Sequence, residues 1–557
     1  MATVAEAIAL TLAEYDTERY FCVTGGDHDL WLAVDEAGID IVNCRSEAAA
    51  TYMADGYARV AGRPGFVYGQ RGPGAANVAA ALADAYWAHS PVVSLTTAIA
   101  AATRDRFQYQ DVDTMQLHAP VTGWSATLSA PARAADLLRA AIRAATGPVP
   151  GPTHLEIPAD LLAQAAGNDT VYREAEAGVV GAIRLAPERA AVTALVDRLL
   201  AAERPLLLAG AGTVISGASP ELATVAETLK APVVTTMGGK GAIAEDSVYA
   251  VGVGGRYSRR IANEVIADCD VVLALGTRLG GLATHAWQLP FGEKRILQVD
   301  ADPRVLGHNY RAEVAVAGDV RLTLQCVIAE LEERSVDAGP SEWLESVQKR
   351  VATWRAHADR LAEATPEDGI HPARVIRELQ AAMAPDDRLV ADTGGIGAWA
   401  GTLFDVRAGR NFIRSAGSLG WAFPAALGAK LADPQRGTVC LIGDGGLLYH
   451  VGELETAVRR GISVTVVVLN NRAFASEHHL LKNLWRRELS KITDFHDVDF
   501  AAVARGFGVD GVTVDDAAGV GAALADALAT DRPTLVDVRA SKEAEAPAEP
   551  FRGEHPV

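Results

Sequence analysis

The residues with the clearest chemical potential form two short runs, each placed directly after an apolar segment. The first is Gly443-Asp444-Gly445-Gly446 and the second is Asn470-Asn471. Mg²⁺ takes hard oxygen ligands beside phosphate oxygens and water, which the Asp444 carboxylate, the Asn471 amide and the Ala473 carbonyl could provide. The glycines would let backbone N–H groups approach a diphosphate at the start of a helix. The pattern therefore predicts a magnesium-diphosphate cradle.

The segments around these runs have the pattern of one β-α-β unit. Residues 438–443 are expected to form a buried strand, residues 447–461 an amphipathic helix that ends at Gly461, and residues 462–471 a second buried strand. A right-handed crossover brings both strand ends to the same edge of a parallel sheet. Asp444 and Asn471 should then face one crevice. The alternative is an ordinary strand-turn-helix with an Asn pair at its end.

This construction resembles the thiamine diphosphate-dependent enzymes of the acetolactate synthase, pyruvate decarboxylase and benzaldehyde lyase group, over nearly the whole chain. Thiamine diphosphate and Mg²⁺ are the cofactors that the resemblance implies. In the segment CRSEAAATYMADGYARVAGRPG, the catalytic glutamate of the family falls at Glu47, which should open a helix. A buried carboxyl there would hydrogen-bond the aminopyrimidine of the cofactor and help it to take the thiazolium C2 proton. The alternative is a glutamate placed by the helix dipole.

Three further loops match cofactor-binding loops of the family. One should lie beside the pyrimidine ring, one around the middle of the cofactor, and one against the diphosphate through its backbone, because acetolactate synthases carry a Gln-His pair where this chain has Gly395-Ile396. Leu419 would hold the cofactor in its bent form, although plain core packing would also suit it. The residues implied are Gly72, Pro73, Asn77, Gly394, Gly395, Ile396, Gly417 and Leu419, together with Glu47, Gly443, Asp444, Gly445, Gly446 and Asn471.

Strand-like and helix-like runs alternate along all 557 residues, which predicts an α/β protein with doubly wound parallel sheets. The family uses three domains. We place a pyrimidine-binding domain at 1–165, a central domain at 187–335, a diphosphate-binding domain at 365–540 and a Pro/Glu-rich tail at 541–557. The joints are polar or weakly patterned. The tail is expected either to be disordered or to fold over the site.

Charge and composition narrow the classes of partner and compartment. The net charge of -19 argues against nucleic acid or an anionic membrane. No apolar run is long enough to span a membrane, and the N-terminus lacks the basic segment of a signal peptide, so a cytoplasmic enzyme is expected. The five cysteines have no metal-ligand spacing, and we interpret them as reduced core residues.

The central domain carries a weak nucleotide-binding signal. Gly210 and Gly212 follow an apolar strand, but the third glycine comes late, at 217, so the spacing is not a dinucleotide fingerprint. Arg278 and Asp300 are the positions to examine for FAD. We favour structural roles for both, and bound FAD remains the less favoured alternative.

Substrate selectivity has the thinnest support in the sequence. The candidates for proton transfer and carbonyl orientation are Asp27, His28, Gln108 and Glu477. Asp27 and Glu477 match acids of pyruvate decarboxylases, whereas His28 and Gln108 match benzaldehyde lyase, and Gln108 also matches acetolactate synthases. Local turn bonds or a solvated helix start would explain the same residues.

The resemblance implies an enzyme that decarboxylates a 2-oxo acid and releases an aldehyde or joins it to an aldehyde acceptor. Ala159 and Leu480 depart from acetolactate synthase, where a lysine and a tryptophan stand, so that exact activity is not expected. A hydroxyketone or 2-hydroxyacyl-CoA lyase, a flavin-dependent 2-oxo acid oxidase and a non-catalytic relative are the alternatives. Because Glu47 and Asp444 belong to different domains, the family arrangement implies a homodimer or homotetramer whose subunits share each site.

Overall fold

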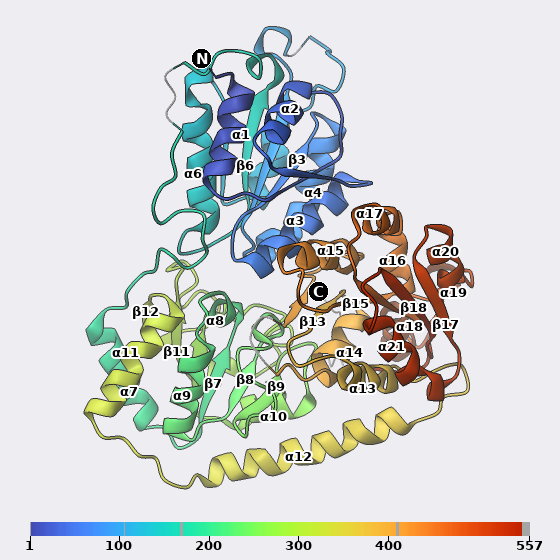
Figure 1. Ribbon diagram of the computed structural model, residues 1–557. Helices are drawn as coiled ribbons and strands as arrows, with labels where there is room; N and C mark the ends of the chain where they lie inside the picture. The colour runs from blue at the N-terminus through green and yellow to red at the C-terminus, as the bar shows by residue number, and fades with distance from the viewer. Residues whose placement is uncertain (1, 105, 168–170, 408–410, 549–557) are drawn as a thin grey trace.

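The computed structural model describes residues 2–104, 106–167, 171–407 and 411–548. Three domains are present, each built on a six-stranded sheet. Figure 1 shows the N-terminal domain in blue and cyan at the top, the central domain in green at the lower left, and the C-terminal domain in orange and red at the right. All pairings within the sheets are parallel, with helices on both faces, so the predicted fold class is confirmed.

The N-terminal sheet has the strand order β2-β1-β3-β4-β6-β5. Its middle strands are buried from end to end, as expected of strands covered on both faces. The strands are β1 (Arg19–Cys22), β2 (Asp40–Asn43), β3 (Gly65–Gly69), β4 (Val92–Ala98), β5 (Trp124–Thr127) and β6 (Thr153–Pro158). The helices are α1 (Val4–Glu14), α2 (His28–Glu36), α3 (Glu47–Ala61), α4 (Pro73–Ala88), α5 (Thr114–His118) and α6 (Ala134–Thr146). Glu47 opens α3, as predicted, and Ser46 caps it by accepting from the Ala49 N–H.

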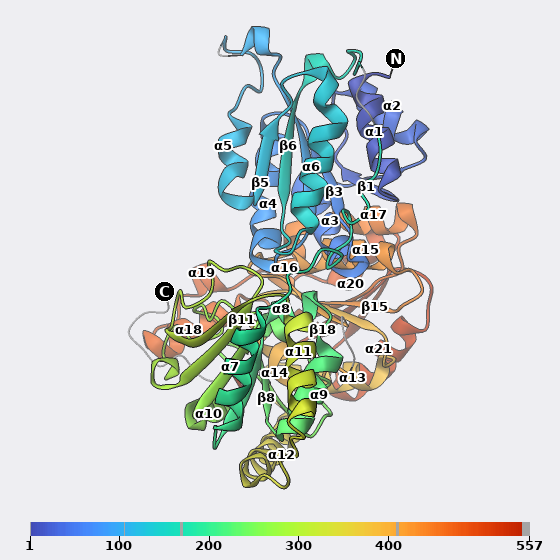
Figure 2. The same cartoon turned by 90° about the vertical axis from the view of Figure 1, so that its left-hand side faces the viewer.

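The central sheet has the order β12-β11-β10-β7-β8-β9. Figure 2 shows this domain below the N-terminal domain, with its helices packed against the sheet. The strands are β7 (Pro205–Ala209), β8 (Val233–Thr235), β9 (Ala250–Val253), β10 (Val271–Leu275), β11 (Arg295–Asp300) and β12 (Ala312–Ala317). The helices are α7 (Arg189–Leu200), α8 (Ala211–Ile215), α9 (Ser219–Leu229), α10 (Arg260–Asp268) and α11 (Val320–Glu333).

The C-terminal sheet has the order β14-β13-β15-β16-β18-β17. The strands are β13 (Arg388–Ala391), β14 (Phe412–Arg414), β15 (Thr438–Gly443), β16 (Thr465–Asn470), β17 (Asp510–Val514) and β18 (Thr534–Arg539). The helices are α13 (Pro372–Ala382), α14 (Gly395–Leu403), α15 (Ala422–Ala432), α16 (Asp444–His450), α17 (Glu453–Arg460), α18 (Ala475–Leu484), α19 (Ser490–Thr493), α20 (Phe500–Gly506) and α21 (Val520–Leu528). The single helix predicted over 447–461 is two helices, since the chain turns at Val451-Gly452, and the first begins at Asp444 itself.

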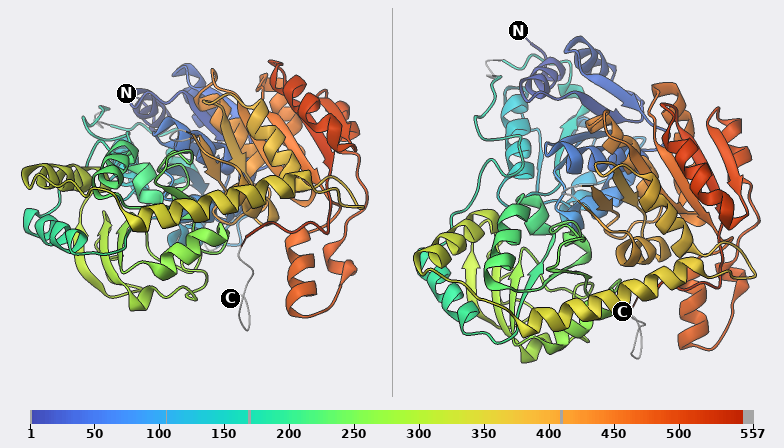
Figure 3. Two further views of the ribbon diagram at one scale, coloured as in Figure 1. Left: turned by 90° about the horizontal axis from the view of Figure 1, so that it is seen from below. Right: turned by 60° about the horizontal axis from the view of Figure 1, so that its bottom comes forward.

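Two features join the domains. Helix α12 (Glu342–Glu363) runs beneath the central domain and leads into the C-terminal one (Figure 3). Helices α3 and α15 pack at unusually short range: a Cβ added to Gly56 would lie 2.1 Å from the Ala425 carbonyl oxygen, and one added to Gly428 would lie 1.9 Å from that of Met53. Only glycine fits at either position. The N-terminal and C-terminal domains consequently share one hydrophobic core.

The cysteine prediction needs one correction. Cys22, Cys44, Cys269 and Cys440 are buried, but Cys326 is exposed, because it lies on the solvent face of α11 rather than in a strand. All five are free thiols. Among the described residues, no helix combines the length and apolar character that crossing a membrane requires.

Candidate active site

The ends of β15 and β16 bring the predicted metal ligands to one edge of the C-terminal sheet. Asp444 is 4% exposed, and its Oδ1 accepts from the Gly445 N–H at 2.8 Å. Its Oδ2 is buried without a hydrogen bond of normal geometry to any described residue. Burial raises the pKa of this carboxyl to about 6, against the lowering effect of nearby backbone N–H groups. A buried acceptor of this kind suits a bound cation.

The two asparagines that follow β16 have different roles. Asn470 donates its amide to the Val498 carbonyl and to Asp537 Oδ1, both at 3.0 Å, so it holds the sheet together. Asn471 lies beyond the strand, and within the described part of the chain its Oδ1 accepts from the Ala473 N–H alone, at 3.1 Å. Asn471 and Ala473 therefore remain the amide and carbonyl candidates beside Asp444, and this all-oxygen set fits Mg²⁺.

Glycine-lined backbone surrounds the carboxylate, and side chains would not fit there. A Cβ on Gly445 would lie 2.7 Å from the Phe474 ring, and a Cβ on Gly446 would lie 2.4 Å from Asp392 Oδ2. Gly394 caps α14 with φ +68°, a conformation that favours glycine. Gly395 and Ile396 follow in the first turn of α14. Two helix N-termini thus begin at this sheet edge, which suits a diphosphate.

The N-terminal sheet edge carries the predicted acid. Glu47 Oε2 accepts from Asn77 Nδ2 at 2.9 Å, and Glu47 Oε1 lies 3.0 Å from a Cβ built on Gly74. Gly72 turns the chain into α4 with φ +71°, and Pro73 is the first residue of that helix. In a single chain Glu47 is half-buried and Asn77 is exposed, so the apolar enclosure expected for the acid is incomplete.

Asp27 lies close by but its carboxylate is already occupied. It caps α2 with φ 48°, and its Oδ2 accepts from Thr97 Oγ1 at 2.7 Å and from the Tyr68 hydroxyl. Arg71 Nη1 lies 3.6 Å from Asp27 Oδ1. The side chain is nearly buried, at 4% exposed. These contacts fix the turn at Gly25-Gly26. The carboxylate of Asp27, a candidate for proton transfer, is thus already bound by hydroxyl groups of its own domain.

The other three candidates are not joined to the acids by hydrogen bonds in one chain. His28, Gln108 and Glu477 are exposed, and among the described residues no side-chain hydrogen bond links any of them to Glu47 or Asp27. Glu477 lies in the first turn of α18, in a different domain from His28. The first residues of the predicted tail pack against α18: Glu543 contacts both His478 and Lys482 of that helix. The tail residues 549–557 lie outside the described part.

Gly417 and Leu419 lie in the loop between β14 and α15. Leu419 is only half-buried, which fits a side chain offered to a ligand better than one in a packed core. The same loop revealed a residue that the sequence analysis missed. Asp84 of α4 is 2% exposed and accepts hydrogen bonds from the loop backbone. An acid within the alanine-rich segment AAALADAYWA was the available signal.

Asp392 is a second missed residue. It follows β13, and its Oδ2 accepts from the Gly420 N–H at 2.9 Å. Burial raises its pKa to about 7. The carboxyl lies between the Gly420 turn and Gly446, so it joins the loop of Leu419 to the glycines of the diphosphate edge.

A cavity of about 440 Å³ lies between the three domains, and Arg278 and Asp300 both line it. Arg278 stacks over the Trp87 ring at 4.7 Å and donates to the Trp87 carbonyl at 2.9 Å. Asp300 Oδ1 accepts from the Asp302 N–H at 2.9 Å, and burial raises the pKa of Asp300 to about 6. Both residues thus have structural contacts of their own.

Comparison with known proteins shows which family carries the two sheet edges that hold Glu47 and Asp444. Three family models cover most of the chain: the N-terminal TPP binding domain of thiamine pyrophosphate enzymes at residues 2–117, the central domain at 192–327 and the C-terminal TPP binding domain at 392–538. The chain belongs to the thiamine pyrophosphate enzyme family. Glu47, Asn77, Asp444 and Asn471 all lie within the two matched TPP binding domains.

Relatives of this thiamine pyrophosphate enzyme have several activities. The acetolactate synthase large subunit of Parasynechococcus marenigrum is 32% identical over 96% of this chain and 87% of its own length. The sulfoacetaldehyde acetyltransferase of Castellaniella defragrans is 32% identical over 99% and 94%. A probable 2-ketoarginine decarboxylase of Pseudomonas aeruginosa is 32% identical over 91% and 88%. Likeness at this level shows the cofactor family and leaves the substrate open.

Proposed function

We propose that this protein uses thiamine diphosphate and Mg²⁺ to cleave the bond between the carboxyl and carbonyl carbons of a 2-oxo acid. The product is released as an aldehyde or joined to an aldehyde acceptor. One observation carries the proposal: the buried, unsatisfied Asp444 Oδ2 in a glycine-lined sheet edge, within the matched TPP binding domain. A carboxylate that stays ionised in such a place is stabilised by a bound cation, which offsets the cost of its burial.

Bound thiamine diphosphate supplies the electron sink for this chemistry. Asp444, Asn471 and the Ala473 carbonyl would hold Mg²⁺, and the N–H groups that start α14 and α16 would meet the diphosphate. Glu47, oriented by Asn77, would hold and pass a proton at the aminopyrimidine ring. Asp27 would act through the Tyr68 and Thr97 hydroxyls that it binds, while His28, Gln108 and Glu477 remain free to orient the carbonyl.

A panel assay tests the reaction directly. The protein is loaded with Mg²⁺ and thiamine diphosphate and incubated with 2-oxo acids, with and without aldehydes, while CO₂ and products are followed together. CO₂ release supports the proposal, and the products separate decarboxylation from ligation. If no acid releases CO₂ but a 2-hydroxy ketone or 2-hydroxyacyl thioester is cleaved, the lyase alternative replaces it. Sulfoacetaldehyde belongs in the panel, given the named activity of one relative.

We also propose that the active unit is a homodimer with shared sites. Asn77 is exposed and Glu47 is only half-buried in one chain, and large apolar side chains are exposed on elements near both sheet edges, including Phe107, Tyr109 and Tyr449. The experiment mixes two inactive variants, Glu47→Gln and Asp444→Ala, by joint refolding. Shared sites would restore about one quarter of wild-type activity, because half of the dimers regain one intact site of two. Sites contained in one chain would restore none.

The sequence also raised FAD as a second cofactor of this protein. Arg278 and Asp300 line the interdomain cavity but already contact Trp87 and Asp302, so we propose that Arg278 joins the central domain to the N-terminal domain, that Asp300 orders its own turn, and that catalysis does not require flavin. A purified holoenzyme without the flavin absorption band near about 450 nm would agree with this proposal. Oxygen consumption with bound yellow cofactor would instead establish the oxidase alternative.

A further inference from the structure

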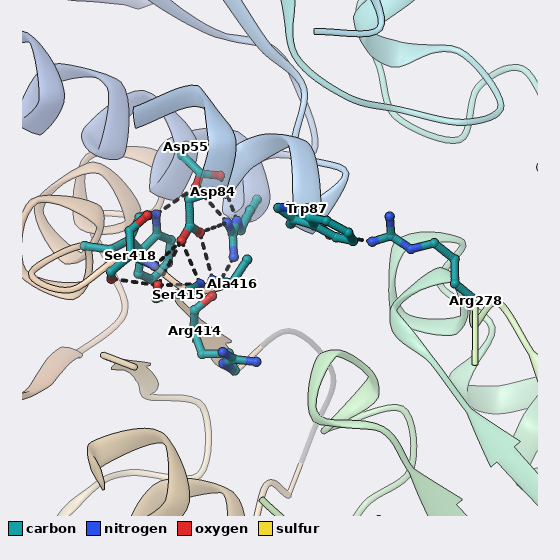
Figure 4. A network of polar contacts seen from close by, with 11 residues as sticks. Asp55, Asp84, Trp87, Arg278, Arg414, Ser415, Ala416 and Ser418 are labelled. Atoms are coloured by element: carbon teal, nitrogen blue, oxygen red, sulfur yellow. Dashed lines mark hydrogen bonds and ion pairs between the residues drawn. The ribbon is translucent and has the colours of Figure 1, made fainter. Parts of the chain in front are cut away.

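Asp84 lies at the centre of a contact between two domains (Figure 4). It projects from α4 in the N-terminal domain toward residues 415–418 of the C-terminal domain, which form the loop that leads to Leu419. Its Oδ1 accepts from the Ala416 N–H at 2.8 Å, and its Oδ2 accepts from the Gly417 and Ser418 N–H groups at 3.0 Å each. The Ser415 hydroxyl donates to the same carboxylate at 2.8 Å. Three successive amides thus surround one carboxylate.

Arg59 supports this arrangement from α3. Its Nη2 donates to Asp84 Oδ1 at 3.1 Å, and its Nη1 donates to the Arg414 carbonyl at 2.7 Å, so it contacts both the acid and the loop. Asp55 binds the other side of Arg59 and accepts from the Trp421 indole N–H at 2.8 Å. Among the described residues, the amides of residues 416–418 donate to Asp84 and not to Asp55.

The charge on Asp84 is stable despite its burial. Burial alone would raise the pKa of this carboxyl, but Arg59 and the loop amides more than offset it, and the pKa is held below its ordinary value. Charge-assisted hydrogen bonds to an ionised acceptor are stronger than neutral ones. An ionised Asp84 therefore fixes the orientation of three successive peptide groups.

The orientation of these peptides exposes their other side. In a trans peptide the carbonyl points opposite to the N–H. Since the N–H groups of residues 416–418 face Asp84, the carbonyl oxygens of residues 415–417 point away from it, and they accept no hydrogen bond from the described residues. Gly417 is exposed, and a Cβ there would meet nothing within 4 Å. Ser415 is buried and Ala416 is half-buried, so the Gly417 carbonyl is the acceptor on the open face of the loop.

We propose that Asp84 is a positioning residue, which orients residues 415–418 so that the free carbonyl group of the exposed Gly417 receives the amino group of the cofactor pyrimidine. This inference rests on the proposed function for its ligand, but the contact itself belongs to the cofactor-free protein. It assigns the N-terminal domain a second role besides carrying Glu47, namely setting the backbone of a loop that belongs to another domain.

Hydrogen exchange in the cofactor-free wild-type protein is the first test. The amides of residues 416–418 should exchange slowly although Gly417 is exposed, because each is bonded to a buried carboxylate. Exchange at the rate of an unprotected loop would overturn the proposal without any variant. This measurement does not depend on the reaction, so it stands even if the protein binds no thiamine diphosphate, an outcome that would reject the proposed function instead.

Asp84→Asn is the decisive variant, because it keeps the shape of the side chain but removes the charge and turns an NH₂ group toward backbone donors. We expect the three amides to exchange about 10- to 100-fold faster and the dissociation constant of thiamine diphosphate to rise at least about tenfold. At saturating cofactor, the pH midpoint of the circular-dichroism band of the imino tautomer should also shift. A purely structural role would lower the melting temperature and leave that midpoint unchanged.

Asp55→Asn is the matched control, since it removes a buried carboxylate of the same Arg59 cluster without touching the loop amides. It should lower the melting temperature but leave exchange at residues 416–418 and cofactor affinity within about twofold of wild type. Ser415→Ala is the milder variant in case Asp84→Asn does not fold. It removes one donor to Asp84 and the acceptor of the Gly417 N–H, so exchange at Gly417 should rise most. Unchanged exchange and affinity in the folded variants would reject Asp84 as a positioning residue.

Discussion

Asn77 donates its side-chain amide to Glu47 Oε2 at 2.9 Å, which joins the first turn of α3 to the first turns of α4. The two residues are thirty positions apart, and Gly74 lies against the other carboxylate oxygen. The acid is therefore oriented by α4 through the hydrogen bond to Oε2 and through the close approach of Gly74 beside Oε1. An orientation fixed before any ligand arrives is what an acid-base residue requires.

Glu47→Gln should separate cofactor binding from cofactor activation. The glutamine oxygen can still accept from Asn77, so affinity for thiamine diphosphate should change less than about threefold, while C2 proton exchange should slow at least about 100-fold. Exchange is followed by NMR after acid quench in deuterium oxide. Glu14→Gln, at the exposed end of α1, is the control for a lost carboxylate in the same domain. Full exchange in the Glu47 variant would remove this residue from the mechanism.

Asp444→Ala should abolish the dependence of cofactor binding on Mg²⁺. The variant lacks the buried carboxylate that we place on the metal, so the dissociation constant measured by tryptophan fluorescence should rise at least about 100-fold and no longer respond to added Mg²⁺. The exposed Asp510→Ala serves as the control in the same domain. If Asp444→Ala kept a metal-dependent affinity near that of wild type, the metal would have to bind elsewhere.

Asp392→Asn should make the cofactor-free protein less sensitive to pH. The native carboxyl has its pKa raised to about 7 from the ordinary 3.8, so the folded state binds its proton more readily than the unfolded state does. The contribution of Asp392 to stability therefore falls as pH rises from about 4 to about 7 and is level above that range. Urea unfolding at pH 5 and pH 8 should show the asparagine variant gaining stability relative to wild type at the higher pH. A difference independent of pH would contradict this assignment.

Glu245→Gln should loosen the contact between the central and C-terminal domains. Glu245 is 1% exposed and lies 2.5 Å from Lys240 Nζ and 3.4 Å from Arg259, while its Oε2 accepts from the Val406 N–H. Removing the charge leaves the buried Lys240 without its ionic partner, while Arg259 keeps its pair with Asp405, at a cost of about 3–5 kcal/mol of unfolding free energy. The exposed Glu313→Gln, which loses surface pairs with Arg198 and Arg295, should cost less than about 1 kcal/mol. Equal losses in urea denaturation would refute the comparison.

The sequence predicted what is local and periodic. Alternating apolar runs identified the three parallel sheets, and strand ends placed Asp444 and Asn471 at one edge, because parallel crossovers leave few other options. The single helix over 447–461 was wrong in detail, since the break at Gly452 depends on packing rather than on periodicity. Cys326 was misplaced for a similar reason, as its side of α11 is decided by a neighbouring helix.

Long-range contacts were beyond reach of the sequence. The residues around Asp84 in the sequence do not indicate that its carboxylate accepts from amides more than 330 positions away. The same holds for Asp27, whose turn-like context hid the Tyr68 and Thr97 hydroxyls that bind it. Whether His28, Gln108 and Glu477 meet was also not decidable from spacing, since they lie in different domains and open loops.

Helix α4 carries Asn77 and Asp84 seven residues apart, so both side chains leave the helix within about 20° of each other and about 10 Å apart along its axis. One partner is the acid Glu47 and the other is a loop of the C-terminal domain. A single inserted residue between them would turn Asp84 by about 100° relative to Asn77 and break one contact or the other. This stretch of α4 should accept no change of length, even though the helix itself contains no proposed catalytic side chain.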